Sequence, residues 1–345
     1  MADKHVVRFE PVGIEIEVAE DQNILRAAAE QGIMLMHGCK EGQCSACKSF
    51  VLEGEDIELE KYSTFALPDY EKEEGFTLLC RAHPYEDLTI ELLNYDEEMI
   101  RSGLPIQTAQ AEVVANTAVT HDLRHLVLRL LQPREITFFP GQYVDLTVPG
   151  TDLTRSFSMA NTSSRDDGRL EFVIKVYPGG LFSQYLDTRL ALGDRLTLTG
   201  PFGVFTLRES PDADLIFVGG GAGLAPILSL LRSMAERGIR RRATFYYGAR
   251  TQRDLCFEQE LRELEGSLPG FRYVPALSEP GTDWPGELGL ITDVVGRHER
   301  DLAKAHAYVC GPPPMVEAAL PLLARLGVPE RRIYYDKFTT TGDPD

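Results

Sequence analysis

The sequence lacks any run of roughly 18 or more apolar residues, so it predicts no transmembrane helix. Its first residues, MADKHVVRFE, lack the apolar stretch of a secretory signal, and we therefore expect a cytoplasmic protein. Positive charge is in the minority, and because phosphate contacts need clustered lysine and arginine, nucleic acid is not an expected partner. The chain is nevertheless 43% hydrophobic and 26% charged, and its 345 residues suffice for two or three globular domains.

The excess of negative charge is confined to one part of the chain. The net charge is −18. Residues 1–100 hold 23 Asp and Glu against 8 Lys and Arg, a balance of −15, whereas residues 101–345 hold 30 against 27, a balance of −3. This asymmetry predicts a separate acidic module at the N-terminus.

The distribution of cysteines also distinguishes the N-terminal segment from the rest of the chain. Four of the six cysteines, Cys39, Cys44, Cys47 and Cys80, lie in the first 80 residues. A disulfide framework would imply secretion, so metal binding is the better interpretation. The C-x4-C-x2-C spacing with a distant fourth cysteine is the plant-type pattern for a [2Fe–2S] cluster. A structural zinc site is the alternative, but such sites usually pair two C-x2-C knuckles and only one is present.

The loop around these cysteines has the composition that a compact inorganic core requires. We expect Gly38 and Gly42 to supply unusual backbone dihedrals, because the loop must bend tightly around the cluster. The small side chains of Ser45 and Ala46 permit close approach. Backbone N–H groups can then point at the sulfurs and stabilise their negative charge.

Hydrophobic periodicity predicts the order of elements. In the acidic module it predicts strands at 6–10, 14–18 and 88–93 and a helix at 24–33 capped by Asp21 or Asn23. Residues 94–107 lose periodicity and contain Gly103 and Pro105, which is typical of an interdomain linker. Short strands then predict a small antiparallel barrel, with strands at 123–131, 143–150, 154–161, 169–177 and 194–201 and a helix at 181–190.

After residue 212 the pattern changes to strands alternating with helices, which predicts a parallel, doubly wound sheet. The strands are expected at 215–221, 243–248, 271–277, 306–311 and 332–338, and the helices at 225–238, around 257–264, and at 316–327. The predicted domains are therefore 1–98, 107–208 and 212–345.

Two motifs in the barrel indicate a flavin. Arg155 ends a strand with Ser156, Phe157 and Ser158, and a planar guanidinium suits a pyrophosphate. Phe157 could pack against the isoalloxazine ring, and Ser158 could hydrogen-bond its N5 edge. Downstream, Gly179 and Gly180 precede Leu181 and Ser183 at the start of a helix, where free amides can bind phosphate. An exposed strand with a plain turn and cap is the simpler interpretation of each motif alone.

Two glycine-containing turns in the third domain indicate a dinucleotide. The first joins a strand to a helix through Gly219, Gly220, Gly221 and Gly223, with Pro226 where the fingerprint has its third glycine. Proline is tolerated in the first turn of a helix, so the phosphate-binding turn is expected to survive.

The second turn, Cys310-Gly311-Pro312, also follows a strand and opens a helix. Cys310 is either a small buried hydrophobe or a neighbour of the nicotinamide. After the strand 243–248, Arg250 and Arg253 could accept a 2′-phosphate, and the strand end has no acidic residue, which favours NADPH slightly.

These signatures in this order resemble the ferredoxin–NAD(P)H reductase family with a fused N-terminal plant-type ferredoxin. The matching segments are CKEGQCSAC with Cys80, RSFS, YPGGLFS, GGGAGLAP, YGAR, CGPPPM and YYDKF. The resemblance extends over nearly the whole chain. The stretch 61–92 is most similar to reductase components of soluble diiron monooxygenases, especially the propane and methane group. The resemblance implies a multidomain fold with a β-grasp [2Fe–2S] ferredoxin, an antiparallel β-barrel FAD domain and an α/β doubly wound nicotinamide domain.

The resemblance also implies roles for individual residues. The four N-terminal cysteines would ligate the cluster, Ser158 and Cys310 would shape the hydride-transfer site, and NADH is favoured over NADPH. The implied FAD-binding residues are Arg155, Ser156, Phe157, Ser158, Ile174, Lys175, Val176, Gly179, Gly180, Leu181, Ser183 and Phe338. The implied nicotinamide-binding residues are Gly220, Gly221, Gly223, Pro226, Gly248, Arg250, Cys310, Gly311 and Pro312. Phe157 stands where many members carry tyrosine, so a phenolic hydrogen bond is absent.

Oxygen activation is not expected on this chain. None of the seven histidines has a glutamate three residues earlier, as carboxylate-bridged diiron sites require. Cys80 and His83 resemble half of a Rieske ligand set, but no Cys-x-His supplies the other half. Oxygen activation is therefore expected on another protein, which receives electrons from NADH through FAD and the cluster. The resemblance implies that this acceptor is the hydroxylase component of a diiron monooxygenase. A Rieske ring-hydroxylating dioxygenase as partner, or a redox-sensing subunit without turnover, remain as alternatives.

The acidic module is the expected docking surface for that partner. Its densest runs of charge lie between two of the predicted ligands and comprise Glu53, Glu55, Asp56, Glu58, Glu60, Asp69, Glu71, Glu73 and Glu74. Steering toward a basic patch on the oxygenase is the functional interpretation, and a solvated surface is the simpler one.

Overall fold

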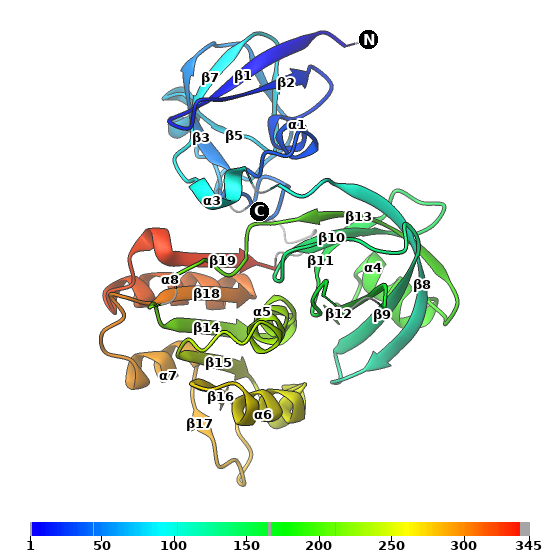
Figure 1. The fold of residues 1–345 in the computed structure, drawn as a ribbon, viewed down its shortest axis with the longest axis vertical. Helices are drawn as coiled ribbons and strands as arrows, with labels where there is room; N and C mark the ends of the chain where they lie inside the picture. Colours follow the sequence, from blue (N-terminus) through cyan, green and yellow to red (C-terminus); the bar gives the residue numbers. More distant parts are fainter. Residues whose placement is uncertain (1, 44, 102, 165–166, 211, 339–345) are drawn as a thin grey trace. The chain divides into compact units, whose positions relative to one another are not determined.

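The computed structural model describes residues 2–43, 45–101, 103–164, 167–210 and 212–338. The chain divides into two compact units, one reaching Ile106 and the other running from Gln107 to Phe338 (Figure 1). No helix within these described ranges is long and apolar enough to span a membrane.

The first unit is a β-grasp domain, in which a five-stranded sheet of order β2-β1-β7-β3-β5 packs against helix α1. The strands of this sheet are β1 (Lys4–Glu10), β2 (Ile14–Ala19), β3 (Lys48–Glu53), β5 (Phe76–Leu78) and β7 (Leu88–Glu91). A two-stranded sheet of β4 (Ile57–Leu59) and β6 (Ala82–Pro84) and the helices α1 (Ile24–Glu30), α2 (Asp69–Glu73) and α3 (Glu97–Ile100) complete it.

The predicted strands and helix of this unit are confirmed. In β2, Ile14, Ile16 and Val18 are buried while the glutamates between them are exposed, which is the period of a strand with one face on a core. The cap of α1 is Asn23, whose Oδ1 accepts a hydrogen bond from the Arg26 backbone N–H at 2.9 Å. Asp21, the other predicted cap, is not the cap residue.

The predicted linker 94–107 was wrong in its first half. Helix α3 lies within it, and Ile100 is buried in the core of the first unit at 2% exposure. The Ile100 carbonyl accepts from the Met34 backbone N–H at 2.9 Å. A Cβ atom on Gly103 would lie 2.3 Å from the Gly32 carbonyl oxygen, so the chain still contacts the first unit at that point. The loss of periodicity reflects a single helical turn, which is too short to show a pattern.

The second unit begins with the expected antiparallel barrel, a nearly closed six-stranded sheet of order β11-β10-β13-β8-β9-β12. Its elements are β8 (Gln107–Ala118), β9 (Leu123–Gln132), β10 (Tyr143–Thr147), β11 (Thr154–Ser158), β12 (Arg169–Lys175), β13 (Arg195–Phe202) and helix α4 (Leu181–Thr188). All of these elements except β8 were predicted. Strand β8 was missed because its buried side is formed by Ala109, Ala111 and Val113, and the small alanines give only a weak hydrophobic alternation.

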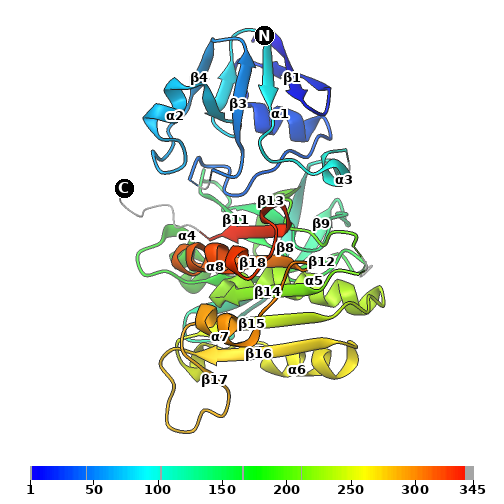
Figure 2. The same ribbon diagram turned by 90° about the vertical axis from the view of Figure 1, so that its left-hand side faces the viewer.

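The chain then forms the predicted parallel, doubly wound sheet, in the order β17-β16-β15-β14-β18-β19 (Figure 2). Its strands are β14 (Leu215–Gly220), β15 (Ala243–Ala249), β16 (Phe271–Leu277), β17 (Glu287–Leu288), β18 (His306–Gly311) and β19 (Ile333–Lys337). Its helices are η1 (Gly221–Gly223), α5 (Leu224–Glu236), η2 (Gln252–Asp254), α6 (Glu258–Ser267), α7 (Ile291–His298), α8 (Pro313–Arg325) and η3 (Glu330–Arg332). Helices α5 and α6 bury their apolar side chains in one core, and α7 and α8 bury theirs in another.

The order of the strands positions the candidate nucleotide site. The chain starts in the middle of the sheet at β14, builds outward through β15, β16 and β17, and then crosses to β18 on the other side. The carboxyl ends of β14 and β18 are therefore adjacent at the point where the winding reverses, which is where open α/β sheets bind ligands.

Candidate cofactor sites

The cysteine loop joins α1 to β3 and brings together thiols from two parts of the sequence. Cys47 directly precedes β3, Cys80 follows β5, and both are almost fully buried. The hydrogen bond between the thiols of Cys80 and Cys47, together with burial and the nearby Cys39, raises the pKa of Cys80 above its ordinary value. Three of the four predicted ligands thus converge. Cys44 lies outside the described residues.

Backbone groups of this loop are directed at a sulfur. The N–H groups of Glu41 and Gln43 donate to Cys39 Sγ at 3.4 and 3.2 Å. Such donors stabilise a thiolate over a neutral thiol. A converging set of cysteines with N–H groups aimed at one of them fits the thiolate ligation of a [2Fe–2S] cluster.

The tight bend of the loop uses more than glycine. Gly42 has the expected left-handed backbone, with φ 69°, but Lys40 and Ser45 are also left-handed, with φ 58° and 54°. For a residue with a side chain this conformation costs about 1 kcal/mol. At Gly42 a Cβ atom would lie 2.7 Å from the Cβ atom of Tyr62, so the segment that begins at Tyr62 packs directly on the cysteine loop.

Strand β11, at one edge of the six-stranded sheet, carries the predicted flavin motif. Arg155 is half-buried, and its Nη1 donates to the Thr154 carbonyl at 2.7 Å. Ser156 Oγ donates to Asp145 Oδ1 on the neighbouring strand β10 at 2.6 Å. The Ser156 hydroxyl is therefore engaged with the sheet itself.

The two residues at the end of β11 differ in their surroundings. The ring of Phe157 packs against that of Phe182 on α4, with centroids 4.8 Å apart. Ser158 is 5% exposed. The motif thus joins the strand to the helix whose N-terminus is the other half of the candidate flavin site.

The turn before α4 leaves backbone donors available. Gly179 is left-handed, with φ 79° and open space where a Cβ atom would stand. Ser183 Oγ accepts from the Tyr177 backbone N–H at 3.0 Å and so fixes the turn. Gly180 is the N-cap and supplies no side-chain acceptor, so the N–H groups of the first helical turn have no side-chain cap. This arrangement fits a phosphate, and Leu181 is 66% exposed beside it.

The segment 174–176 at the end of β12 is held by Asp122. Lys175 pairs with the Asp122 carboxylate, and the Val176 backbone N–H donates to the Asp122 carbonyl at 2.8 Å. Ile174 points into the barrel core and is 2% exposed. A ligand would therefore meet the backbone of this segment rather than the Ile174 side chain.

The glycine turn between β14 and α5 contacts the end of β18. Gly221 is left-handed, with φ 55°. A Cβ atom on Gly223 would lie 2.1 Å from the Cys310 carbonyl oxygen, and one on Gly220 would lie 2.9 Å from Met315 Sδ. Pro226 is buried in the first turn of α5, as predicted. Only glycine permits this approach, which makes a narrow turn whose N–H groups suit a pyrophosphate.

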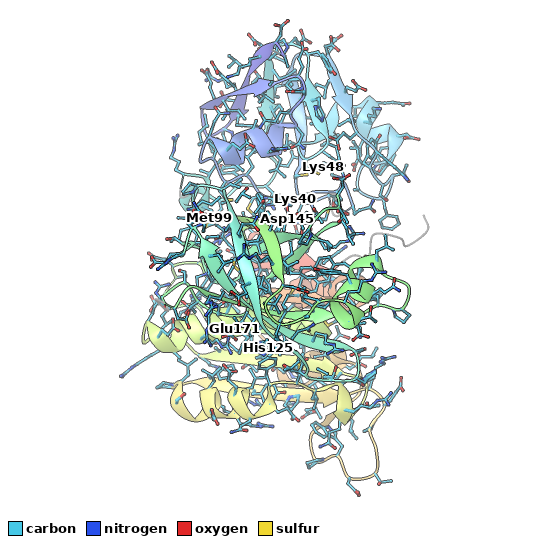
Figure 3. The ribbon with its side chains drawn as sticks, turned by 90° about the vertical axis from the view of Figure 1, so that its right-hand side faces the viewer. Lys40, Lys48, Met99, His125, Asp145 and Glu171 are labelled. Atoms are coloured by element: carbon cyan, nitrogen blue, oxygen red, sulfur yellow. The ribbon has the colours of Figure 1, made fainter. Side chains whose placement is uncertain are left out.

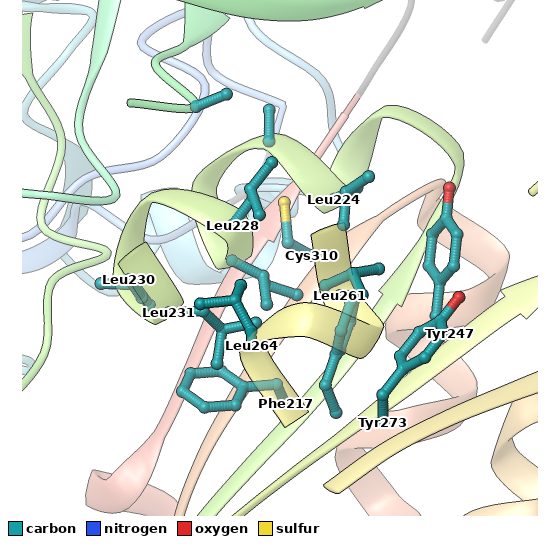
Figure 4. Close-up of a cluster of buried hydrophobic side chains, with 14 of the residues drawn as sticks. Phe217, Leu224, Leu228, Leu230, Leu231, Tyr247, Leu261, Leu264, Tyr273 and Cys310 are labelled. Atoms are coloured by element: carbon teal, nitrogen blue, oxygen red, sulfur yellow. The ribbon is translucent and has the colours of Figure 1, made fainter. Parts of the chain in front are cut away.

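Cys310 lies near the carboxyl end of β18, beside this glycine turn. It is fully buried, and burial raises the pKa of its thiol well above the ordinary value, so it stays protonated. Figure 4 shows its sulfur between Leu224 and Leu228 of α5. Gly311 next to it has φ 149°, and its carbonyl accepts from the Phe338 backbone N–H at 3.0 Å. The structure thereby brings the C-terminal aromatic to the same turn, which continues into Pro312, the N-cap of α8.

The remaining predicted nucleotide residues follow β15. A Cβ atom on Gly248 would lie 2.9 Å from Ile291 Cβ, so helix α7 covers that residue. Arg250 and Arg253 are exposed. The carboxylate between them and the helix, Asp254, already accepts from the backbone N–H and the hydroxyl of Thr251 at 2.8 and 2.7 Å.

The sequence prediction missed two exposed aromatic residues of the first unit. Phe65 is 90% exposed and Tyr70 is 62% exposed. Phe65 lies in the turn after Tyr62, and the Ser63 backbone N–H donates to the Gly42 carbonyl at 3.0 Å. A single aromatic residue among polar ones gives no periodic signal, so only its exposure next to the cysteine loop identifies it.

The acidic runs of this domain are mostly, but not wholly, exposed. Glu71 is paired with Lys48 at 2.6 Å, and Glu60 is paired with Arg81 and, at 2.9 Å, with His83. The other seven residues of the two runs are exposed acidic side chains.

Three family models match successive parts of the chain. The 2Fe-2S iron-sulfur cluster binding domain matches residues 7–85, the oxidoreductase FAD-binding domain matches 110–207, and the oxidoreductase NAD-binding domain matches 217–320.

Relatives match over the full length. The chain is 53% identical over 345 residues to the propane 2-monooxygenase reductase component of Mycolicibacterium smegmatis, with 99% of each chain covered. It is 38% identical to the phenol 2-monooxygenase reductase component DmpP of a Pseudomonas species, covering 98% of this chain and 95% of that one. Among solved structures, the Amycolatopsis cytochrome P450 reductase GcoB is 31% identical with a TM-score of 0.87, covering 98% of this chain and 100% of that one.

Proposed function

The chain belongs to the family of monooxygenase reductase components that carry 2Fe-2S, FAD-binding and NAD-binding domains, and from this premise we propose that it supplies electrons to a separate diiron hydroxylase that oxidises an alkane such as propane. The expected resemblance is thereby confirmed, and so is the class of activity, an electron-transfer oxidoreductase. Its cofactors are FAD, NADH and a [2Fe–2S] cluster. When bound, the flavin takes the two electrons of a hydride and the cluster carries them one at a time.

The partner is proposed from the names of the relatives. Relatives that are 53% identical over the full length are propane 2-monooxygenase reductase components. One solved structure of similar fold is a cytochrome P450 reductase, so the architecture alone does not specify the oxygenase. A Rieske dioxygenase remains the second candidate. We also propose a cytoplasmic location, because free thiols as cluster ligands and an NADH donor suit a reducing compartment.

Site roles are proposed for the residues that the fold brings together. Cys39, Cys44, Cys47 and Cys80 hold the cluster. The end of β11 with Ser158 and the first turn of α4 hold the flavin, and the turn at Gly221–Gly223 with Gly311 holds the nicotinamide dinucleotide. Cys310 shapes this site by packing and through its carbonyl, because its buried thiol offers neither a base nor a nucleophile. We propose that the first domain continues past residue 98 through α3 to Ile106, and that the other two domains are 107–208 and 212–345.

The ferredoxin domain is the proposed docking surface. It holds the balance of −15, and its exposed acidic runs flank the turn that carries Phe65. Specific interfaces commonly combine an aromatic anchor with a charged rim. We therefore propose that Phe65 and Tyr70 contact the hydroxylase and that the surrounding carboxylates steer the approach toward a basic patch.

The observation that carries the proposal is the coexistence of the three cofactor domains on one chain that matches reductase components over its full length. The test is reduction of ferricyanide and of cytochrome c by NADH, together with analysis of iron, sulfide and flavin. We expect two iron atoms and one flavin per chain. Bound zinc without labile sulfide would refute the cluster, and negligible turnover by the holoprotein would favour a redox-sensing subunit.

A further inference from the structure

Helix α5 begins directly after the glycine turn, and polar side chains on one of its faces contact the barrel. Ser229, Arg232 and Glu236 recur at the spacing of one helix face. Ser229 Oγ donates to the Asn161 carbonyl at 2.6 Å, and the Glu236 carboxylate accepts from Thr162 Oγ1 at 2.9 Å. The segment that leaves the flavin strand β11 therefore runs along the helix that leaves the nicotinamide turn.

Arg232 is the centre of this contact. Its side chain is 10% exposed. Nε and Nη2 donate to the two carboxylate oxygens of Glu260 on α6, at 2.7 and 2.9 Å. Nη1 donates to Glu171 Oε2 on β12 and to the Ala160 carbonyl, both at 3.0 Å. One planar guanidinium thus joins two helices of the nucleotide domain to two segments of the barrel.

The barrel side of this network is also held in place. His125 Nε2 lies 3.3 Å from the same Glu171 oxygen, and Figure 3 shows these two side chains side by side. The ring of His125 packs edge-on against Phe257, which precedes α6, with centroids 5.3 Å apart. Burial alone would raise the pKa of Glu171, but the hydrogen bond with His125 and the charge of Arg232 lower that pKa to about 2. Glu171 is therefore an ionised partner at neutral pH.

The position of the network relates it to the proposed hydride transfer. Ala160 lies two residues after Ser158, and Arg232 lies just over two helical turns after Leu224, the first residue beyond the glycine turn. Transfer between two bound groups requires an approach of roughly 3–3.5 Å, and a displacement of about 1 Å can slow a reaction strongly. Any rotation of α5 relative to β11 and β12 would change the distance between the bound nicotinamide and the bound flavin.

A charged network is better suited to orientation than to stability. Apolar contacts already join the two halves, since Leu123, Ala160 and Val173 of the barrel share a core with α5. Replacing a buried ion network by apolar side chains is often neutral or stabilising, because the charges must be desolvated. Apolar surfaces can slide over one another, whereas a guanidinium that makes four hydrogen bonds fixes direction.

We propose, on the basis of the proposed function, that Arg232 is a positioning residue for hydride transfer: with Glu171 and Glu260 it fixes the flavin strand relative to the nicotinamide turn. It touches neither cofactor site. Its contribution is therefore expected in the rate of flavin reduction and not in the binding of NADH.

The test is anaerobic stopped-flow reduction of the flavin in the full-length holoprotein over a range of NADH concentrations. Arg232→Lys keeps the charge but cannot make the fork of hydrogen bonds. We expect its limiting reduction rate to fall at least ~10-fold, while the Kd for NADH stays within about twofold. Arg262→Lys is the matched control, because Arg262 pairs with Glu265 on the same helix α6 and lies away from the barrel contact. It should leave both values within about twofold.

A limiting rate of Arg232→Lys equal to that of the unchanged protein would overturn the proposal, as would a loss explained entirely by a higher Kd. If Arg232→Lys retains no flavin, Glu171→Gln decides, because it removes one charge and preserves shape. A slower limiting rate with unchanged Kd in Glu171→Gln supports the proposal, and an unchanged rate overturns it. Failure of the unchanged protein to be reduced by NADH would instead contradict the proposed function.

Discussion

Gly223 lies directly against the carbonyl of Cys310, so that a Cβ atom at residue 223 would stand 2.1 Å from that oxygen. The contact joins the glycine turn after β14 to the end of β18, the two strands between which the winding of the sheet reverses. It explains why the turn needs glycine at this point, whereas the third glycine of the fingerprint is dispensable and is replaced by Pro226 in the first turn of α5.

Gly223→Ala is therefore expected to displace the turn. Because the obstacle is backbone and not a flexible side chain, NADH-driven reduction of the flavin should fall at least ~10-fold. Steady-state reduction of ferricyanide by NADH measures this. Gly266→Ala in α6 is the matched control, since a Cβ atom there meets nothing within 4 Å. Equal activity of both variants would contradict the proposed role of the turn.

Loss of one cluster ligand should separate the two halves of the electron path. In Cys47→Ser we expect iron and labile sulfide to be lost, because a ligating thiolate is removed, and reduction of cytochrome c to fall at least ~10-fold. Reduction of ferricyanide by NADH should persist, since it needs only the flavin unit. Cys256 is a buried cysteine outside the loop, so the control variant Cys256→Ser should retain the full iron content of the protein. Full iron content in Cys47→Ser would remove that residue from the ligand set.

The acidic runs of the ferredoxin domain predict a salt-dependent association with the hydroxylase. Replacing the exposed Asp69, Glu73 and Glu74 by their amides should lower the association rate at low salt by ~10-fold and flatten its dependence on ionic strength. Glu263→Gln on the exposed side of α6 is the control. An association rate that is independent of salt in the unchanged protein would show that steering is absent.

The ion pair of Glu171 predicts a specific pH dependence of stability. Its pKa is lowered from 4.5 to about 2 in the folded chain. The stabilisation is therefore complete above pH 4.5 and is lost as the pH falls toward 2. Comparing the flavin-release temperatures of Glu171→Gln and the unchanged protein, we expect a constant difference from about pH 8 to 5 that shrinks below about pH 4.5. A difference that persists undiminished at about pH 3 would contradict this assignment.

Local patterns were sufficient to predict most of the fold. Strands with strict alternation, such as Ile14, Ile16 and Val18, and the glycine turns at strand ends have strong signals because backbone geometry demands those residue types. Elements with weak or short patterns were missed. Strand β8 buries small alanines, α3 is a single turn, and α7 follows a proline- and glycine-rich loop that hides its buried side, formed by Ile291, Val294 and Val295.

The turns and strand ends that carry the predicted cofactor residues were predictable from motifs, whereas their tertiary contacts were not. Arg232 lies within an apolar helical run, and nothing in the sequence indicates that it faces Glu171, 61 residues earlier. The same holds for Phe65, whose position next to the cysteine loop depends on the hydrogen bond from the Ser63 backbone N–H to the Gly42 carbonyl. Such contacts depend on tertiary packing, which periodicity does not encode.

The most direct test of the proposed function is hydroxylation of propane by a purified diiron hydroxylase with this chain and NADH as the only source of electrons. We expect NADH-dependent formation of propanol, which Cys80→Ser should abolish while reduction of ferricyanide by that variant remains. No product with the unchanged, fully loaded protein, or undiminished product with Cys80→Ser, would contradict it.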